Sequence, residues 1–209
     1  MQAIIRAAAV RAGIAVSLCV CALAGAYAAE PIRIVALGDS NFGAPGVARE
    51  QAFPAKLERA LRAKGYNIVV VNEGINGDTT MGVMGRLDTA VPQGTHLVLL
   101  TIGVNDVLHY KMSREASLAN IAKIESRLRE RGIEVVRLPT GKRFHGSAAE
   151  NPDLHVEKYQ KAGTSFWHLN AAGYDVAVAE HMPKIEPIVA ELSRKGDVSR
   201  KSEPGRKRK

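Results

Sequence analysis

Cysteine is almost absent from this 209-residue chain, whose two cysteines, Cys19 and Cys21, both lie among its first 28 residues. Without cysteine, the rest of the chain cannot form disulfides, perform thiol chemistry or hold a cysteine-ligated zinc. Histidines and carboxylates show no grouping at the short spacings typical of metal ligands. Five of the histidines are scattered: His96, His109, His145, His155 and His181. The sequence therefore predicts neither a metal nor another cofactor.

Net charge is absent from the central part of the chain. The formal charge of +8 comes from two arginines near the N-terminus and from the last sixteen residues, which hold eight basic and two acidic side chains. Residues 29–193 sum to zero and offer no electrostatic case for nucleic acid. Residues 194–209 lack apolar periodicity and are predicted to be a disordered basic tail. Two roles are open for it: weak contact with an anionic surface, or solubility alone.

Long apolar runs are also missing, except at the N-terminus. There, two arginines precede the apolar run Ala12–Ala24, and an A-x-A cleavage pattern follows at residues 26–28. An uncleaved membrane anchor is one alternative, but the run is shorter than the about 20 residues that span a bilayer. A lipoprotein is another, although Leu18 is bulkier than the residue that usually precedes such a cysteine. We expect residues 1–28 to be a cleaved signal peptide and the protein to be periplasmic or secreted.

Between these ends, short apolar runs alternate with helical periodicity. The expected strands are 32–37, 68–71, 96–102 and 133–138, and the expected helices are 53–64, 79–90, 113–131 and 171 onward, the last interrupted by prolines 183 and 187. Residues 139–160 are predicted to be a long polar loop with one helical turn. Strands that are apolar throughout favour a parallel sheet buried on both faces. The fold predicted for residues 29–193 is one α/β domain, a doubly wound, flavodoxin-like parallel sheet of four to five strands with helices on both faces.

The first strand, IVALGDSNFG, ends abruptly at Gly38-Asp39-Ser40. One interpretation makes Ser40 the cap of the following helix, because serine accepts backbone N–H bonds well there. The other makes Ser40 a nucleophile, because open α/β sheets bind ligands at the carboxyl ends of their strands.

Three further polar clusters follow at strand ends or before the final helix. NEGINGDTT contains Gly77, GVND contains Asn105, and SFWHLNAAG contains His168. Each has a structural interpretation, because glycine and asparagine form turns, Asn170 can cap a helix and a lone histidine is commonly structural. Serine acyl transfer, however, needs a nucleophile, a base and donors aimed at the developing oxyanion. Ser40, His168, Gly77 and Asn105 are the residue types that this chemistry uses.

In this order, the four blocks resemble those of the SGNH (GDSL-type) hydrolase family from Ile32 to about Leu192. The resemblance implies Ser40 as nucleophile, His168 as base, and the N–H of Gly77 and the amide of Asn105 as oxyanion donors. Arg86-Leu87 and the FPAKL helix start also resemble the periplasmic thioesterase/arylesterase branch.

One position departs from the family pattern. An aspartate is expected three residues before the histidine, where this chain has Ser165. That group orients the imidazole and stabilises its charged form. Three explanations are open: Ser165 or a backbone carbonyl orients His168, Asp153 or Glu157 supplies the carboxylate from the upstream loop, or the protein is impaired and mainly binds ligands.

Two functions from different classes therefore remain. The first is an exported serine ester hydrolase of esterase, lipase, lysophospholipase or thioesterase type, acting on a small-molecule or lipid acyl ester; carbohydrate O-deacetylation is a variant of that chemistry. The second is a non-catalytic binding module of the same fold, which the serine at position 165 favours.

Overall fold

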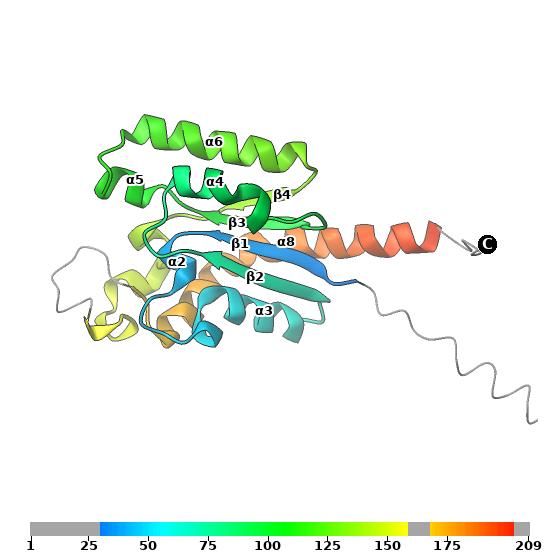
Figure 1. Cartoon of the computed structure of the whole chain (residues 1–209). Coiled ribbons are helices and arrows are strands. Elements are labelled where there is room, and N and C mark those ends of the chain that lie inside the picture. The colour runs from blue at the N-terminus through cyan, green and yellow to red at the C-terminus, as the bar shows by residue number, and fades with distance from the viewer. Residues whose placement is uncertain (1–29, 159–167, 203–209) are drawn as a thin grey trace, which may run out of the picture. The chain divides into compact units, whose positions relative to one another are not determined.

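Four parallel strands form one sheet in the order β2-β1-β3-β4, in a computed structural model that describes residues 30–158 and 168–202 (Figure 1). The strands are β1 (Ile32–Gly38), β2 (Ile68–Gly74), β3 (Leu97–Thr101) and β4 (Glu134–Arg137). β1 pairs with β2 on one side and with β3 on the other. This arrangement confirms the predicted doubly wound α/β class, with the smaller of the two expected strand numbers.

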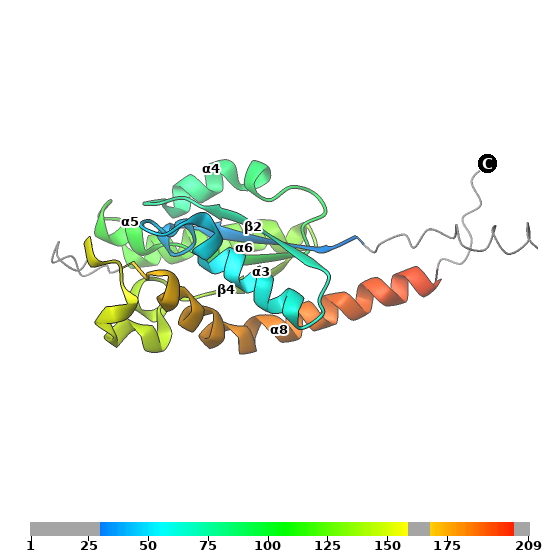
Figure 2. The same ribbon diagram turned by 90° about the horizontal axis from the view of Figure 1, so that it is seen from below.

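The sheet is covered on both faces because successive side chains of a strand point to opposite sides. Ile34 and Ala36 of β1 belong to one buried cluster, and Val35 and Leu37 belong to a second. The first cluster includes residues of α3 (Phe53–Ala63) and α8 (Ala171–Ser202); the second includes residues of α4 (Thr80–Ala90) and α6 (Arg114–Glu130). Figures 1 and 2 show these helix pairs on opposite faces of the sheet.

Helix boundaries follow local chemistry. Ser113 caps α6 by accepting a hydrogen bond from the N–H of Ala116 at 3.1 Å, and Thr79 caps α4 through the N–H of Gly82 at 3.1 Å. α3 has Pro54 in its first turn, where a missing backbone N–H costs nothing. These three helices lie within one or two residues of their predicted bounds.

The prediction that prolines interrupt the final helix is wrong. α8 continues from Ala171 to Ser202 with Pro183 and Pro187 inside it. Both prolines are exposed, so the carbonyls that lose an intrahelical partner can bond water, while Ile185 and Val189 hold the same stretch in the core. The helix also includes residues 194–202, which the sequence placed in the tail. An i,i+4 ion pair from Glu191 to Lys195, 2.8 Å long, supports this extension.

The segment after β4 is more ordered than a polar loop. It contains three 3₁₀ helices, η3 (Gly141–Arg143), η4 (Gly146–Glu150) and η5 (Pro152–Leu154). Phe144 anchors it because its ring is fully buried between the other elements. Two short α-helices were also unexpected: α2 (Ser40–Gly43) and α5 (Val104–Leu108). Among the described residues, no helix has both the length and the apolar character needed to cross a bilayer.

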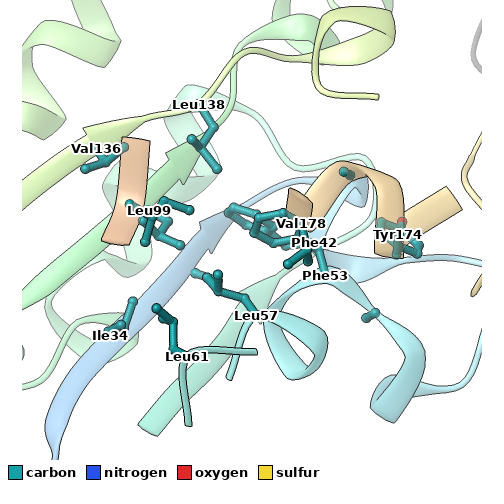
Figure 3. Close-up of a cluster of buried hydrophobic side chains, with 14 of the residues drawn as sticks. Ile34, Phe42, Phe53, Leu57, Leu61, Leu99, Val136, Leu138, Tyr174 and Val178 are labelled. Carbon is teal, nitrogen blue, oxygen red and sulfur yellow. The ribbon is translucent and has the colours of Figure 1, made fainter. Parts of the chain in front are cut away.

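Three aromatic rings join α2, α3 and the segment after β4. The ring centroid of Phe42 lies 5.6 Å from that of Phe53 and 5.8 Å from that of Phe144, and the last two rings are 5.2 Å apart. Figure 3 shows Phe42 and Phe53 within this buried hydrophobic cluster. Because Phe42 stands two residues after Ser40, this packing also positions the helix that carries the serine.

Replacing Phe42 by alanine should lower the free energy of unfolding by about 3–5 kcal/mol, the usual loss for a buried aromatic ring. Urea denaturation monitored by circular dichroism measures this loss. Tyr110→Ala is the control, because Tyr110 is 67% exposed and its loss should change stability by less than about 0.5 kcal/mol. Equal effects of the two substitutions would show that the ring cluster does not hold α2.

Candidate active site

Ser40 is the first residue of α2, immediately beyond the carboxyl end of β1. The residue that caps this helix is Asp39, whose Oδ1 accepts from the backbone N–H of Asn41 at 3.0 Å and from its side-chain amide at 2.9 Å. The interpretation of Ser40 as the helix cap is therefore wrong. Neither the hydroxyl nor the N–H of Ser40 makes a hydrogen bond within the described part of the chain. Both groups are free to bind a ligand.

The loop that contains Gly77 packs beside α2. A Cβ atom at Gly43, the last residue of α2, would clash with the side chain of Asn76. Gly77 has φ +79°, a conformation that favours glycine, and the following N–H of Asp78 donates to the carbonyl of Ile75 at 3.1 Å. The N–H of Gly77 has no acceptor among the described residues. The turn thus leaves this donor available.

Arg86 of α4 binds the same loop through its guanidinium group. Its Nε and Nη2 atoms donate to Asp78 Oδ2 at 3.0 and 2.8 Å, and Nη2 also donates to the carbonyl of Glu73 at 2.9 Å. A role for Arg86 in positioning this loop was not predicted from the sequence. Nothing local could have indicated it, because its partners precede it by eight and thirteen residues.

Asn105 lies on α5 rather than in a loop, and its side chain is buried. Its Nδ2 donates to the carbonyl of Asp78 at 2.8 Å. This bond uses one of the two amide protons and leaves the second for a ligand. Because Asp78 follows Gly77 directly, the bond also joins the second and third polar clusters. Gly77 therefore lies between a neighbour that packs on α2 and a neighbour that is bonded to Asn105.

Asp106 has a structural task beside Asn105. Its fully buried carboxylate accepts from the N–H and the hydroxyl of Thr80, both at 3.1 Å, and from the hydroxyl of Ser117 at 3.0 Å. These bonds attach α5 to the starts of α4 and α6. They account for the aspartate that follows Asn105 without a catalytic role.

His168 stands just before α8. The N–H of Val156 donates to its carbonyl at 2.8 Å, the next residue, Leu169, forms an antiparallel bridge with His155, and Asn170 caps α8 by accepting from the N–H of Gly173 at 3.0 Å. The helix-cap interpretation of Asn170 is confirmed. Burial lowers the pKa of the His168 imidazole, and the nearby Lys158 ammonium acts in the same direction. The neutral base is therefore favoured.

Three side chains are candidates for the group that orients His168. Ser165 lies outside the described residues. Asp153 is exposed, and within the described part of the chain its carboxylate forms no hydrogen bond or ion pair. Glu157 is also exposed.

Two histidines that the sequence shows as scattered come together. The rings of His145 and His155 have centroids 5.4 Å apart, and both side chains are buried. Burial lowers the pKa of His145 to about 4, with further contributions from His155 and His168. The residues that the structure describes contain no group of three metal-ligating side chains suited to an ion.

Asp39 has the most perturbed carboxyl group of the site. Its side chain is fully buried, and Oδ2 has no hydrogen-bond partner among the described residues. Burial raises its pKa from 3.8 to about 7, against the hydrogen bonds from Asn41, which act to lower it. A pKa raised on folding stabilises the folded state below the ordinary pKa, and that contribution is lost as pH rises through the folded value.

The unfolding free energy of the parent relative to Asp39→Asn should therefore fall by roughly 4 kcal/mol between about pH 4 and pH 7. Urea denaturation at several pH values gives this difference. The substitution keeps an oxygen acceptor for Asn41 and removes the titration. Buried histidines with lowered pKa values give the opposite pH dependence, but they are present in both proteins and cancel. A difference that does not change with pH would contradict the raised pKa.

The chain is similar to known proteins of one family. Residues 36–164 match the GDSL-like lipase/acylhydrolase family, a stretch that contains Ser40, Gly77 and Asn105 and ends before His168. An arylesterase of Vibrio mimicus is 33% identical over 131 residues, covering 59% of this chain and 64% of that protein. Esterase TesA of Pseudomonas aeruginosa is 33% identical over 112 residues, covering 53% and 54%. The chain thus spans less than two thirds of the length of these curated relatives.

Among solved structures, the SGNH-hydrolase family esterase AlinE4 is 26% identical, with a TM-score of 0.51, and the match covers 84% of this chain and 98% of that one. The family match includes more than half of the chain and three of its four polar clusters, so the chain belongs to the GDSL-like lipase/acylhydrolase family.

Proposed function

We propose that this protein is an exported serine hydrolase that cleaves acyl esters or thioesters through an acyl-enzyme on Ser40. One observation carries the proposal. Ser40 stands beyond the end of β1, and among the described residues its hydroxyl and N–H make no hydrogen bond. Within the same residues the N–H of Gly77 is also unbonded, and the neighbouring Asp78 carbonyl accepts from the Asn105 amide. A nucleophile and three donors from separate elements are thereby collected at one edge of the sheet.

In the first half of the reaction, Ser40 Oγ attacks the carbonyl carbon while His168 accepts the hydroxyl proton. The carbonyl oxygen becomes an oxyanion, which the N–H groups of Ser40 and Gly77 and the second amide proton of Asn105 stabilise. Collapse of this intermediate breaks the bond to the leaving group, and His168 returns the proton to the departing alcohol or thiol. The lowered pKa of His168 keeps the base neutral before the attack.

In the second half, His168 removes a proton from water, which attacks the acyl-enzyme carbonyl. The same donors stabilise the second oxyanion, and the proton passes to Ser40 as the acid departs. The donors are held before substrate arrives, because Arg86 and the Asn105 amide both bond to Asp78, the residue that follows Gly77. Donors that need no reorientation stabilise the transition state most effectively.

Several groups are candidates for orienting the imidazole of His168. Asp153 has the least support, because its exposed carboxylate has no bonding partner among the described residues. Ser165, a backbone carbonyl and Glu157 remain. The alternative function, an impaired or non-catalytic binding module, rests on the serine at position 165, where the family pattern has aspartate.

The domain organisation also remains a proposal. A signal peptide in residues 1–28 would direct the domain, residues 29–193, to the periplasm or the exterior, and its substrate would be a small-molecule or lipid ester found there. The basic residues that follow would contribute at most a weak contact with an anionic surface.

Removing the hydroxyl in Ser40→Ala should lower kcat for p-nitrophenyl butyrate by about 10³-fold or more. Asn105→Ala should lower kcat by about 10²–10³, the usual effect of losing one oxyanion donor. Release of p-nitrophenol gives both rates. Ser126→Ala, on the exposed surface of α6, is the matched control and should retain parental activity. Parental kcat in the Ser40 variant would contradict Ser40 as the nucleophile, and a parent that hydrolyses no ester would favour the binding-module function.

A carboxylate at position 165 should complete the family arrangement. In Ser165→Asp we expect kcat to rise and the acidic limb of the kcat/KM profile to move to higher pH, because a neighbouring carboxylate raises the pKa of the imidazole. Ser165→Asn is the uncharged control and should show neither change. If Ser165→Asp has no effect while Glu157→Gln or Asp153→Asn abolishes activity, the acid comes from the upstream segment.

A further inference from the structure

A cavity of about 440 Å³ lies at the carboxyl ends of β3 and β4. Its lining comes from α5 and the first half of α6 and from the segment between Arg137 and Arg143. Val104 and Val107, which flank Asn105 on α5, line it. The lining of the cavity therefore includes the chain neighbour of Asn105, the proposed oxyanion donor.

The lining of this cavity is mainly apolar, and the charged side chains among the described lining residues have one sign. Ile102, Leu118, Ile121 and Leu138 contribute to the apolar part. Three arginines line it, Arg114, Arg137 and Arg143, and no carboxylate does.

Two of these guanidinium groups have no partner among the residues that the structure describes. Within the described part of the chain, neither Arg114 nor Arg143 forms an ion pair or a side-chain hydrogen bond. Arg137 has only a loose contact, with its Nε atom 3.8 Å from a carboxylate oxygen of Glu125. Two arginines elsewhere in the domain are paired: Arg86 with Asp78, and Arg127 of α6 with Asp88 at 3.0 Å. The cationic cavity is thus a local feature, although residues 29–193 carry no net charge.

The apolar surface beside the cavity is also exposed. Val107, Leu108 and Leu118 are 43%, 47% and 44% exposed, and all three line the cavity. An apolar wall combined with unpaired arginines suits a ligand that has a hydrocarbon part and an anionic group. Guanidinium binds carboxylate and phosphate oxygens in pairs, so it recognises such a group better than a neutral one.

We propose that the cavity selects esters that carry an anionic oxygen group, a carboxylate or a phosphate, beyond a short hydrocarbon stretch from the reacting carbonyl. Arg114 and Arg143 bind the anion, and the side chains of α5 and α6 contact the hydrocarbon. This inference rests on the proposed ester hydrolysis at Ser40. It adds a substrate class that the four polar clusters do not specify.

Two matched substrate pairs test the proposal. In the first, mono-p-nitrophenyl adipate carries a carboxylate on the acyl side, and p-nitrophenyl hexanoate is its neutral counterpart. In the second, 1-hexanoylglycerol 3-phosphate carries phosphate on the leaving-group side, and 1-hexanoylglycerol is neutral. The full-length protein and its Arg114→Gln/Arg143→Gln variant are compared, with Arg127→Gln as the control for loss of an arginine from α6 outside the cavity.

We expect the parent to prefer the anionic member of one pair by about tenfold in kcat/KM, as fits charge-assisted bonds at a partly exposed site. The preference should disappear in the double variant, persist in Arg127→Gln and weaken at high salt. The pair that responds identifies whether the anion belongs to the acyl or the leaving group. Activity on the neutral esters should remain, because the arginines do not contact the reacting atoms.

Equal kcat/KM values within both pairs, or a preference that survives loss of the two arginines, would overturn the inference and leave ester hydrolysis intact. If the parent cleaves none of the four esters, the proposed hydrolysis fails instead. Calorimetric titration of the parent with adipate then tests the cavity by itself. Binding that is lost in the double variant supports anion recognition, and absence of binding overturns it.

Discussion

The close approach of three strand ends at Gly38 is the constraint on which the site depends. Gly38 is in register with Gly74 of β2 and with Thr101 of β3, and a Cβ atom at Gly38 would overlap the carbonyl of Thr101. The strands consequently end at the same level. Ser40, Gly77 and Asn105 follow these three ends by two, three and four residues. Parallel pairing therefore brings together residues that are far apart in the sequence.

Beyond the strand ends, buried polar side chains hold the candidate site in place. Asp39 organises the first turn of α2, Asp78 accepts from Arg86, and Asp106 joins α5 to its neighbours. Such networks are costly when incomplete, because a buried polar group without a partner loses its hydration. The hydroxyl of Ser40 makes no hydrogen bond within the described part of the chain. The three aspartates thus maintain the structure of the candidate site, whereas the hydroxyl of Ser40 is available to a ligand.

The segment after β4 contributes side chains to the core, to the surroundings of His168 and to the cationic cavity. Phe144 buries its ring against Phe42 and Phe53, and this fixes the start of a stretch that also contributes His145 to the surroundings of His168. The same segment supplies Arg143 to the cationic cavity. One short polar stretch thus lies near the proposed base and, by our proposal, contributes to the choice of substrate.

The sequence by itself determined the sheet, the helix starts at Thr80 and Arg114, and the family, because apolar runs, capping residues and ordered motifs are local patterns. Proximity was decided only by tertiary structure. The meeting of His145 with His155, the bond from Asn105 to the Asp78 carbonyl, and the arginines around one cavity join residues from different elements. No local pattern encodes such meetings, because they depend on how helices pack on the sheet. The identity of the cap of α2 also depended on tertiary structure. The N–H of Asp39 donates to the carbonyl of Thr101 on the neighbouring strand, and the helix begins directly after Asp39, so that Asp39 and not Ser40 is the cap.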